Sequence, residues 1–227
     1  MLRHLSHPVT ALAQNATLIW CDTTRAAAWV DPGADAKTLE QLARGRGLHL
    51  KKILLTHGHL DHVGAAAELA ARAGVPIIGP QCEDAFWLGQ LPAQALAFGL
   101  PHTPPLTPDQ WLEDGDRVEL GRSGLDVLHC PGHTPGHVVF HDPESHLALV
   151  GDVLFHGAIG RSDLPRGNSH ELLRSITEKL WPLGDETRFI PGHGEEATFG
   201  EERRSNPLVA DHVLTIQPQP CGRGRYY

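Results

Sequence analysis

Several features are scarce or missing in this sequence of 227 residues. No apolar run at the N-terminus reaches signal-peptide length, and no later run is long enough for a membrane-spanning helix. The four cysteines are far apart and include no CxxC pair, which is typical of a reduced protein without a disulfide framework. They are Cys21, Cys82, Cys130 and Cys221. We therefore expect a soluble cytoplasmic protein with no membrane partner.

Positive charge is also scarce. Lys and Arg number 19 against 27 Asp and Glu, so the formal net charge is -8. A nucleic-acid partner would favour a basic surface, and we expect none. The sequence has no Pro/Gly/Ser-rich linker and no strong internal repeat. We predict one domain over residues 1–216 and a loose C-terminal tail over 217–227, where Pro, Gly and Arg are enriched.

Histidine, by contrast, is abundant, with 16 residues. Three of them occur in the stretch Thr56-His57-Gly58-His59-Leu60-Asp61-His62, between an apolar run at 51–55 that predicts a strand and residues 63–73 that predict a helix. Imidazole and carboxylate are usual ligands of zinc, iron and manganese. A His-rich solvated loop is the alternative, but these four side chains within six residues can be aimed into one small volume. They cannot complete two metal sites alone, so further ligands are expected downstream.

Three later turns each place one ligand-type side chain at the end of a predicted strand. The first is Cys130-Pro131-Gly132-His133-Thr134-Pro135-Gly136-His137, whose Gly and Pro residues fix a turn that projects His133. The second is Gly151-Asp152, and the third is Pro191-Gly192-His193-Gly194. A single histidine in such a turn is usually a surface residue. Three turns of this kind after the His/Asp stretch indicate a shared site.

The remaining pattern indicates a mixed α and β protein. Strands are predicted at 9–13, 17–21, 26–30, 51–55, 77–78, 117–120, 125–129, 138–141, 147–150 and 187–190. Helices are predicted at 35–44 with Asp35 as N-cap, at 63–73 and 169–180, and within 195–206. The β-α-β order around residue 63 favours parallel neighbours in one sheet. Residues 81–114 form a less regular insertion. Its aromatic side chains can pack on the core or line a substrate groove, and we expect them to pack on the core or as a lid.

The order of these motifs resembles the metallo-β-lactamase-fold hydrolases, from about Val9 to Pro207. The resemblance implies an α+β fold, a four-layer αββα sandwich. It also implies a centre of two divalent metal ions, zinc in the first place, with iron or manganese as alternatives. By this resemblance His57, His59 and His133 hold one metal, Asp61, His62 and His193 hold the second, and Asp152 bridges the pair.

Within that superfamily the chain is most similar to the hydroxyacylglutathione hydrolases (glyoxalase II), in the short bacterial branch without the C-terminal helical domain. The stretches that carry this similarity are Gln14-Asn15, residues 160–167 and residues 202–207. The resemblance implies a metal-dependent thioester hydrolase that cleaves S-2-hydroxyacylglutathione, such as S-lactoylglutathione, in methylglyoxal detoxification. A metal-bound hydroxide would attack the thioester, and Asp61 would orient it. Longer relatives take several glutathione contacts from the C-terminal domain, so its absence bears on substrate identity more than on the reaction.

Four further residues near these motifs have two interpretations each. Arg161, just past Asp152, can clamp a substrate carboxylate or form a surface salt bridge, and Arg166 is a weaker candidate of the same kind. His137 can be a donor that orients a metal ligand or an ordinary strand residue. Cys130 stands next to the metal turn, but His133 fills the ligand position there.

Other reactions of the same fold remain open from the sequence. A mononuclear iron persulfide dioxygenase would share the His-rich stretch and residues 160–163 but leave the second metal site unused. The form of residues 191–194 favours the hydrolase. Hydrolysis of a lactone, a β-lactam or another ester is a third possibility, and a metal-dependent binding module without turnover is a non-enzymatic one.

Overall fold

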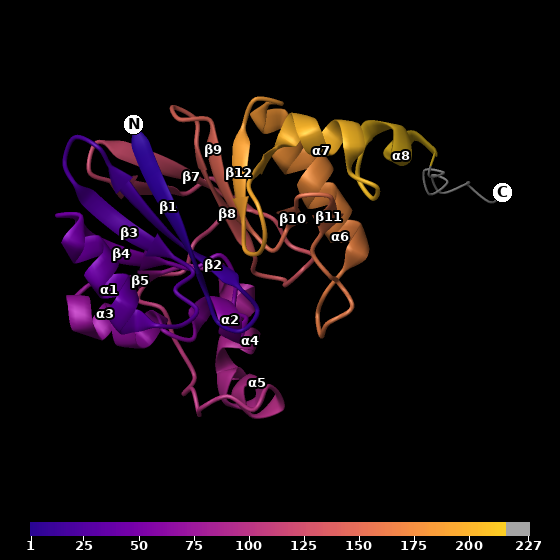
Figure 1. The fold of residues 1–227 in the computed structure, drawn as a ribbon. Helices are drawn as coiled ribbons and strands as arrows, with labels where there is room; N and C mark the ends of the chain where they lie inside the picture. The colour runs from indigo at the N-terminus through magenta and orange to yellow at the C-terminus, as the bar shows by residue number, and fades with distance from the viewer. Residues whose placement is uncertain (217–227) are drawn as a thin grey trace.

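The computed structural model describes residues 1–216, which form two β-sheets packed face to face (Figure 1). The first sheet has the order β1-β2-β3-β4-β5 and the second the order β13-β12-β9-β8-β7-β6. The strands of the first sheet are Leu2–Val9, Gln14–Cys21, Ala26–Val30, His49–Leu54 and Ile77–Ile78. Those of the second are β6 Arg117–Leu120, β7 Ser123–His129, β8 Val138–Asp142, β9 Leu147–Gly151, β12 Arg188–Pro191 and β13 Ala197–Thr198. A separate hairpin pairs β10, Leu154–Phe155, with β11, Ala158–Ile159.

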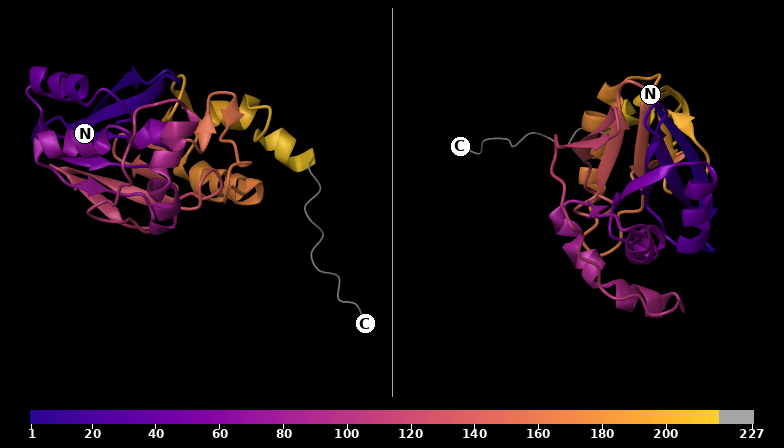
Figure 2. Two further views of the ribbon diagram at one scale, coloured as in Figure 1. Left: turned by 90° about the horizontal axis from the view of Figure 1, so that it is seen from below. Right: turned by 90° about the vertical axis from the view of Figure 1, so that its left-hand side faces the viewer.

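Helices cover the outer face of each sheet (Figures 1 and 2). Helices α1, Ala36–Gly45, and α3, Ala66–Ala73, pack on the first sheet. The second sheet is covered by α6, Ser169–Arg174, its π-helical continuation Ser175–Leu180, and α7, Phe199–Ser205. The remaining helices are α2 Leu60–Val63, α4 Ala85–Gly89, α5 Leu91–Ala97 and α8 Asp211–Ile216. Helices α4 and α5 protrude beyond one end of the sandwich.

Strands buried on both faces produce this layering. Along β2, Leu18 packs toward the helices of the first sheet while Ile19 packs between the two sheets. Along β8, Phe140 lies between the sheets and its neighbour Val139 faces the helices of the second sheet. Successive side chains of a strand point to opposite faces, so each such strand feeds two hydrophobic layers. The predicted four-layer αββα sandwich is confirmed.

The structure corrects several predicted boundaries. The first strand covers Leu2–Val9 rather than 9–13, because Thr10 and Ala13 adopt positive φ angles of 63° and 52° in a turn. Asp35 occupies the N-cap position of α1, but its side chain makes no capping hydrogen bond. The helix predicted at 63–73 is divided into α2 and α3, so the His-rich stretch already enters a helix at Leu60.

Other elements differ less or were not predicted. Strands β4 and β5 are parallel, as expected. The irregular insertion contains the short helices α4 and α5. The helix predicted within 195–206 spans Phe199–Ser205, and a capping box at Thr198 sets its start. The hairpin β10–β11, strand β13 and helix α8 had no counterpart in the sequence pattern.

Two predictions fall outside what the structure tests. The tail at 217–227 lies outside the described residues, and the assignment of 1–216 to a single domain stays a prediction. Among the described residues, no helix combines the length and apolar character needed to cross a bilayer.

The layer between the sheets is expected to carry much of the stability. Phe140 is fully buried there, and Phe140→Ala should lower the free energy of unfolding by about 3–5 kcal/mol through lost transfer energy and a residual cavity. Leu96, 83% exposed on α5, is the control, and Leu96→Ala should change the value by less than about 0.5 kcal/mol. Urea denaturation followed by circular dichroism measures both. Equal losses of unfolding free energy in Phe140→Ala and Leu96→Ala would contradict the assignment of Phe140 to the core.

Candidate metal centre

All seven predicted ligands lie on segments at one end of the sandwich. His57 and His59 follow β4, and Asp61 and His62 are on α2. His133 is on the turn between β7 and β8, Asp152 directly follows β9, and His193 lies two residues after the end of β12. Strands β9 and β12 are parallel neighbours, so their carboxyl ends meet at the same edge. The turns recognised in the sequence therefore place the predicted ligands next to the ends of rigid strands.

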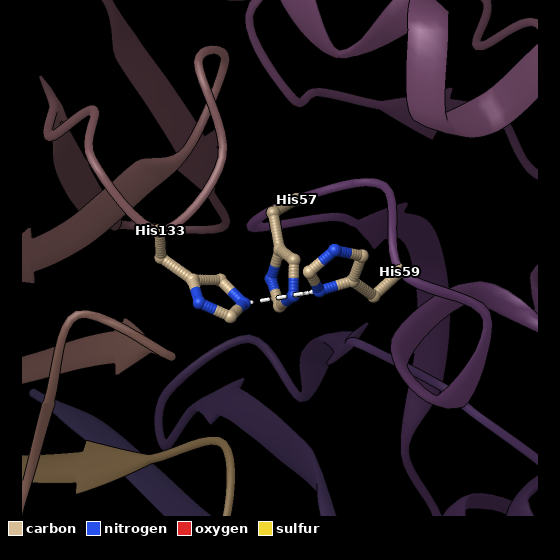
Figure 3. Close-up of side chains that lie close together, drawn as sticks. All are labelled: His57, His59 and His133. Atoms are coloured by element: carbon tan, nitrogen blue, oxygen red, sulfur yellow. Dashed lines mark hydrogen bonds between the residues drawn. The ribbon is translucent and has the colours of Figure 1, made fainter. Parts of the chain in front are cut away.

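Three imidazole rings form the first cluster (Figure 3). His59 Nδ1 lies 3.1 Å from His57 Nε2 and 3.0 Å from His133 Nε2. Metal–nitrogen bonds of 2.0–2.1 Å in a tetrahedral site put neighbouring ligand atoms about 3.3 Å apart. The three rings, drawn from two loops far apart in the sequence, are thus close to the spacing that one ion requires.

Asp61, His62 and His193 form the second cluster. Their ligand atoms lie within 4.8 Å of one another. His193 Nε2 is 3.2 Å from Asp61 Oδ2, and His62 Nε2 is 3.8 Å from the same oxygen. This set combines two nitrogen donors with one oxygen donor, which suits zinc, iron and manganese.

Asp152 stands between the two clusters. Its Oδ2 lies 3.6 Å from His133 Nε2 in the first cluster and 3.8 Å from His193 Nε2 in the second. Its Oδ1 lies 3.3 Å from His62 Nε2. One carboxylate therefore faces ligand atoms of both clusters, as a bridging ligand must.

Two buried atoms test whether the residues fit metal ions. Among the described residues, His62 Nε2 and Asp152 Oδ1 have no hydrogen-bond partner. Buried polar atoms are almost always satisfied, and an exception calls for a missing ligand or water. The two atoms lie 3.3 Å from each other, about the spacing of two ligand atoms on one divalent cation, which would satisfy both. The donor set therefore fits a pair of divalent ions, and the role of each residue as a ligand stays a prediction.

Protonation differs between the two clusters. Burial lowers the pKa of His57 well below its ordinary value and that of His59 to about 3. Burial also acts to lower the pKa of His62, but the carboxylates of Asp152 and Asp61 raise it overall. Burial alone would raise the pKa of Asp152, yet the facing His62 ring holds it far below the usual range. Neutral imidazoles and ionised carboxylates are the forms that ligate metals.

Hydrogen bonds from Nδ1 fix the orientation of four of the five rings. His62 Nδ1 donates to Asp31 Oδ2 at 2.9 Å, and His133 Nδ1 donates to the carbonyl of Arg161 at 2.7 Å. His57 Nδ1 lies 3.0 Å from Thr56 Oγ1, and His193 Nδ1 lies 3.1 Å from the carbonyl oxygen of Leu12. In each of these rings Nε2 is thereby the nitrogen that faces the cluster. His59 has the opposite orientation, with Nδ1 in the cluster.

Asp31 is connected by hydrogen bonds to a ring of each cluster, to His62 directly and to His57 through Thr56. The sequence analysis missed this role. Its Oδ1 accepts from the backbone N–H of Thr56 at 2.7 Å, and its Oδ2 accepts from the Thr56 hydroxyl at 2.5 Å and from His62. Asp31 also falls within ligand distance of His57 and His62, but its oxygens are already used by these donors. The signal that could have found it is its position directly after a buried strand, like that of Asp152.

Asn15 and His137 also support the centre. The Asn15 amide donates to the carbonyls of Pro191 and Gly194 at 3.1 and 2.9 Å, which clips the His193 loop to the first sheet. His137 is fully buried, and its Nε2 accepts from the backbone N–H of Asp152 at 3.0 Å. The proposed donor role of His137 is therefore wrong in direction, since the ring accepts and fixes the Asp152 backbone.

Three other candidates lie apart from the ligand clusters. The Arg161 guanidinium is exposed and binds Asp163 with two contacts of 2.8 and 2.9 Å. The Arg166 guanidinium lies 4.1 Å above the Phe86 ring. Cys130 is buried in the core beneath the second sheet, where burial raises the pKa of its thiol to about 12.

A cleft of about 570 Å³ opens onto the two clusters. Its walls are largely apolar and come from α4, α5, the loop after β11 and the turn at Leu12. Its lining includes Leu12, Phe86, Trp87, Ala93, Gln94, Phe98, Arg161, Leu164 and Pro165, together with His59, Asp61, His133, Asp152 and His193. Trp87 is buried, as expected for packing on the core. Phe86 and Trp87 also line the cleft, which is the alternative that the sequence analysis did not favour.

Residues 9–193, a range that includes all seven predicted ligands, match the family described as the Metallo-beta-lactamase superfamily. The chain belongs to this superfamily. It is 48% identical over 203 residues to the hydroxyacylglutathione hydrolase GloC of Haemophilus influenzae, an alignment covering 89% of this chain and 95% of the relative.

Two solved structures are similar to this chain in fold. The crystal structure of TTHA1623 in a di-iron-bound form has a TM-score of 0.82 at 39% identity and covers 90% of this chain and 99% of that one. The crystal structure of the BLEG-1 B3 metallo-beta-lactamase has a TM-score of 0.85 at 32% identity and covers 91% and 99%. The predicted metallo-β-lactamase-fold enzyme is confirmed.

Asp31 provides a test of the supporting hydrogen bonds. Asp31→Asn replaces one acceptor oxygen by an amide NH₂ that must face Thr56 or His62, both of which donate. We expect zinc affinity to fall by roughly 10–100-fold, as for other partners that orient metal ligands. Competition with a chromophoric chelator measures the affinity. Asp22→Asn, on the exposed turn after β2, is the control, and unchanged affinity in Asp31→Asn would contradict the orienting role.

Proposed function

We propose that this protein is a dinuclear metal-dependent thioester hydrolase that cleaves S-2-hydroxyacylglutathione, such as S-lactoylglutathione, to glutathione and a 2-hydroxy acid. Zinc is the proposed metal, with iron or manganese as the alternative. The proposed ligands are His57, His59 and His133 for one ion and Asp61, His62 and His193 for the other, with Asp152 shared between them.

The observation that carries this proposal is the position of Asp152. Its carboxylate faces His133 on one side and His62 and His193 on the other, at 3.3–3.8 Å. A mononuclear iron dioxygenase would need no second set of donors. Here a second set lies beside the first, so the arrangement favours two ions acting together.

Two bound divalent ions lower the pKa of a shared water and act as Lewis acids on a carbonyl oxygen. The chain supplies the geometry for this chemistry. Asp61 is partly exposed and faces the cleft, so it is placed to accept a hydrogen bond from the attacking nucleophile. The neighbouring His62 and His193 rings hold Asp61 ionised, because they lower its pKa although burial alone would raise it. A thiolate leaves readily, so the reaction needs no dedicated general acid.

The choice of substrate rests on the cleft and on the relatives. The Haemophilus influenzae relative is named a hydroxyacylglutathione hydrolase. The cleft volume of about 570 Å³ falls within the range of about 300–1,000 Å³ usual for small-molecule sites. Arg161 is the one guanidinium among the residues that line the described cleft, and we propose that it binds a carboxylate of the glutathione moiety.

Hydrolysis of S-lactoylglutathione by the zinc-replete protein is the direct test, followed as loss of the thioester. We expect turnover that a chelator abolishes and zinc restores. Asp61→Ala should lower kcat by at least about 100-fold, since even residues that only orient metal ligands contribute 10–100-fold. The metal-free variant should unfold near the same temperature as the metal-free parent. A folded protein with two metals and no turnover would contradict the proposed substrate.

One alternative is supported by a specific finding, the similarity to the BLEG-1 B3 metallo-beta-lactamase. The same metal-replete sample should therefore be assayed with a chromogenic β-lactam. Turnover of the β-lactam with a kcat/KM above that for the thioester would replace the proposed reaction. Oxygen consumption with glutathione persulfide would instead indicate the dioxygenase.

Arg161 gives a separate test of the glutathione contact. Arg161→Ala should raise KM for S-lactoylglutathione by roughly 10–100-fold with little change in kcat, because a lost hydrogen bond to a charged group costs about 1.5–3 kcal/mol of binding. Arg174 on α6 forms a similar exposed ion pair with Glu178 on the π-helical continuation. It is not among the residues that line the cleft, so Arg174→Ala is the matched control. Equal KM values for the two variants would remove Arg161 from the site.

A further inference from the structure

The inference concerns Asp84, which lies in the irregular insertion and outside both ligand clusters. Asp84 is fully buried and occupies the N-cap position of α4, yet its side chain makes no capping hydrogen bond to that helix. An aspartate at this position normally satisfies the free N–H groups of the first turn. Its carboxylate is directed elsewhere.

All three hydrogen bonds to the Asp84 carboxylate come from the two loops of the first cluster. Oδ2 accepts from the backbone N–H of Gly58 at 2.7 Å and from the Thr134 hydroxyl at 2.8 Å. Oδ1 accepts from the backbone N–H of Gly136 at 2.6 Å. Gly58 separates His57 from His59, and Thr134 follows His133, so one oxygen atom joins the two loops next to their metal-facing rings.

Close packing reinforces this link. A Cβ atom at Gly58 would lie 2.7 Å from the Cβ of Trp87, and one at Gly136 would lie 2.5 Å from the Asp84 nitrogen. Both loops therefore rest directly on the segment that carries Asp84. Gln94 on α5 adds a second contact, since its Oε1 accepts from the backbone N–H of Leu60 at 2.9 Å.

The Asp84 carboxylate is buried away from water, which disfavours its ionised form. Removal from water raises the pKa of its carboxyl to about 6, although the three hydrogen bonds act in the opposite direction. A buried carboxylate is tolerated where its hydrogen bonds are satisfied. Here every one of those bonds fixes a loop that presents a proposed metal ligand.

We propose that Asp84 is a positioning residue for the metal centre, which holds the His57/His59 loop and the His133 loop at the separation that one metal ion requires. The inference rests on the metal centre of the proposed function and not on its substrate. Asp84 touches no ligand atom, and it acts through the backbone of the residues between and beside the ligands.

Zinc affinity of the first cluster alone tests this role. His193→Ala removes a donor of the second cluster and provides the background in which the first cluster is titrated with zinc. Adding Asp84→Asn leaves one carbonyl oxygen for three donors, so an amide NH₂ must face Gly58, Thr134 or Gly136. We expect zinc affinity to fall by roughly 10–100-fold and the visible spectrum of the Co²⁺-loaded protein to shift.

Glu202 offers a matched control. It is also a fully buried carboxylate with three polar partners, namely His156, the backbone N–H of Gly157 and Asn206, and these lie around α7 and the β10–β11 hairpin. Glu202→Gln in the same background should lower the unfolding temperature but change zinc affinity less than about threefold. Equal losses of affinity in both variants, or none in Asp84→Asn, would overturn the proposal.

A second variant covers the case in which Asp84→Asn does not fold. Thr134→Val removes one of the three hydrogen bonds and keeps the shape of the side chain, and it should weaken zinc binding by about three- to tenfold. Unchanged affinity and an unchanged Co²⁺ spectrum would then overturn the inference. The zinc titration uses no thioester. It therefore tests the role of Asp84 even if the parent protein does not hydrolyse S-lactoylglutathione.

Discussion

Five imidazole rings and two carboxylates face one another in a largely buried volume, and this crowding is the constraint that the rest of the structure meets. Lone pairs directed at one point repel, and buried ionised groups are costly unless they are paired. Asp152 partly offsets the cost, because its negative charge lies within 3.3–3.8 Å of three rings. The arrangement is held by groups behind the rings, which donate or accept hydrogen bonds away from the shared volume.

These supporting groups connect parts of the sandwich that the chain order keeps apart. Asp31 ends a strand of the first sheet and orients His62 directly and His57 through Thr56. Asn15, also from the first sheet, holds the loop that follows β12 in the second sheet. The two sheets are therefore joined at this end by polar contacts as well as by the apolar layer between them. The spacing of the proposed metal ligands and the packing of the sheets depend on the same relative position of the two sheets.

The sequence was informative wherever a functional side chain coincided with a strong local signal. His57, Asp152 and His193 each follow an apolar strand, and Gly-rich turns mark the strand ends. The four-layer detail came from the resemblance to a family, because alternation within a fully buried strand does not indicate which layer faces which. Local signals also misplaced the first strand, since the positive φ angles of Thr10 and Ala13 lie in a turn that has no glycine or proline.

The groups that the sequence did not indicate are those that act over long sequence separations. Asp84 is 26 residues from Gly58 and 52 from Gly136, and it lies in a segment whose pattern predicted only an irregular insertion. That same segment forms one wall of the cleft and packs against the His57/His59 loop. A movement of α4 and α5 that widened the cleft would therefore also pull on the loops of the first cluster. The cleft wall and the spacing of the proposed ligands are for this reason connected through one segment. A change in the insertion that reshapes the cleft is expected to leave the first cluster in place only where the hydrogen bonds of Asp84 are kept.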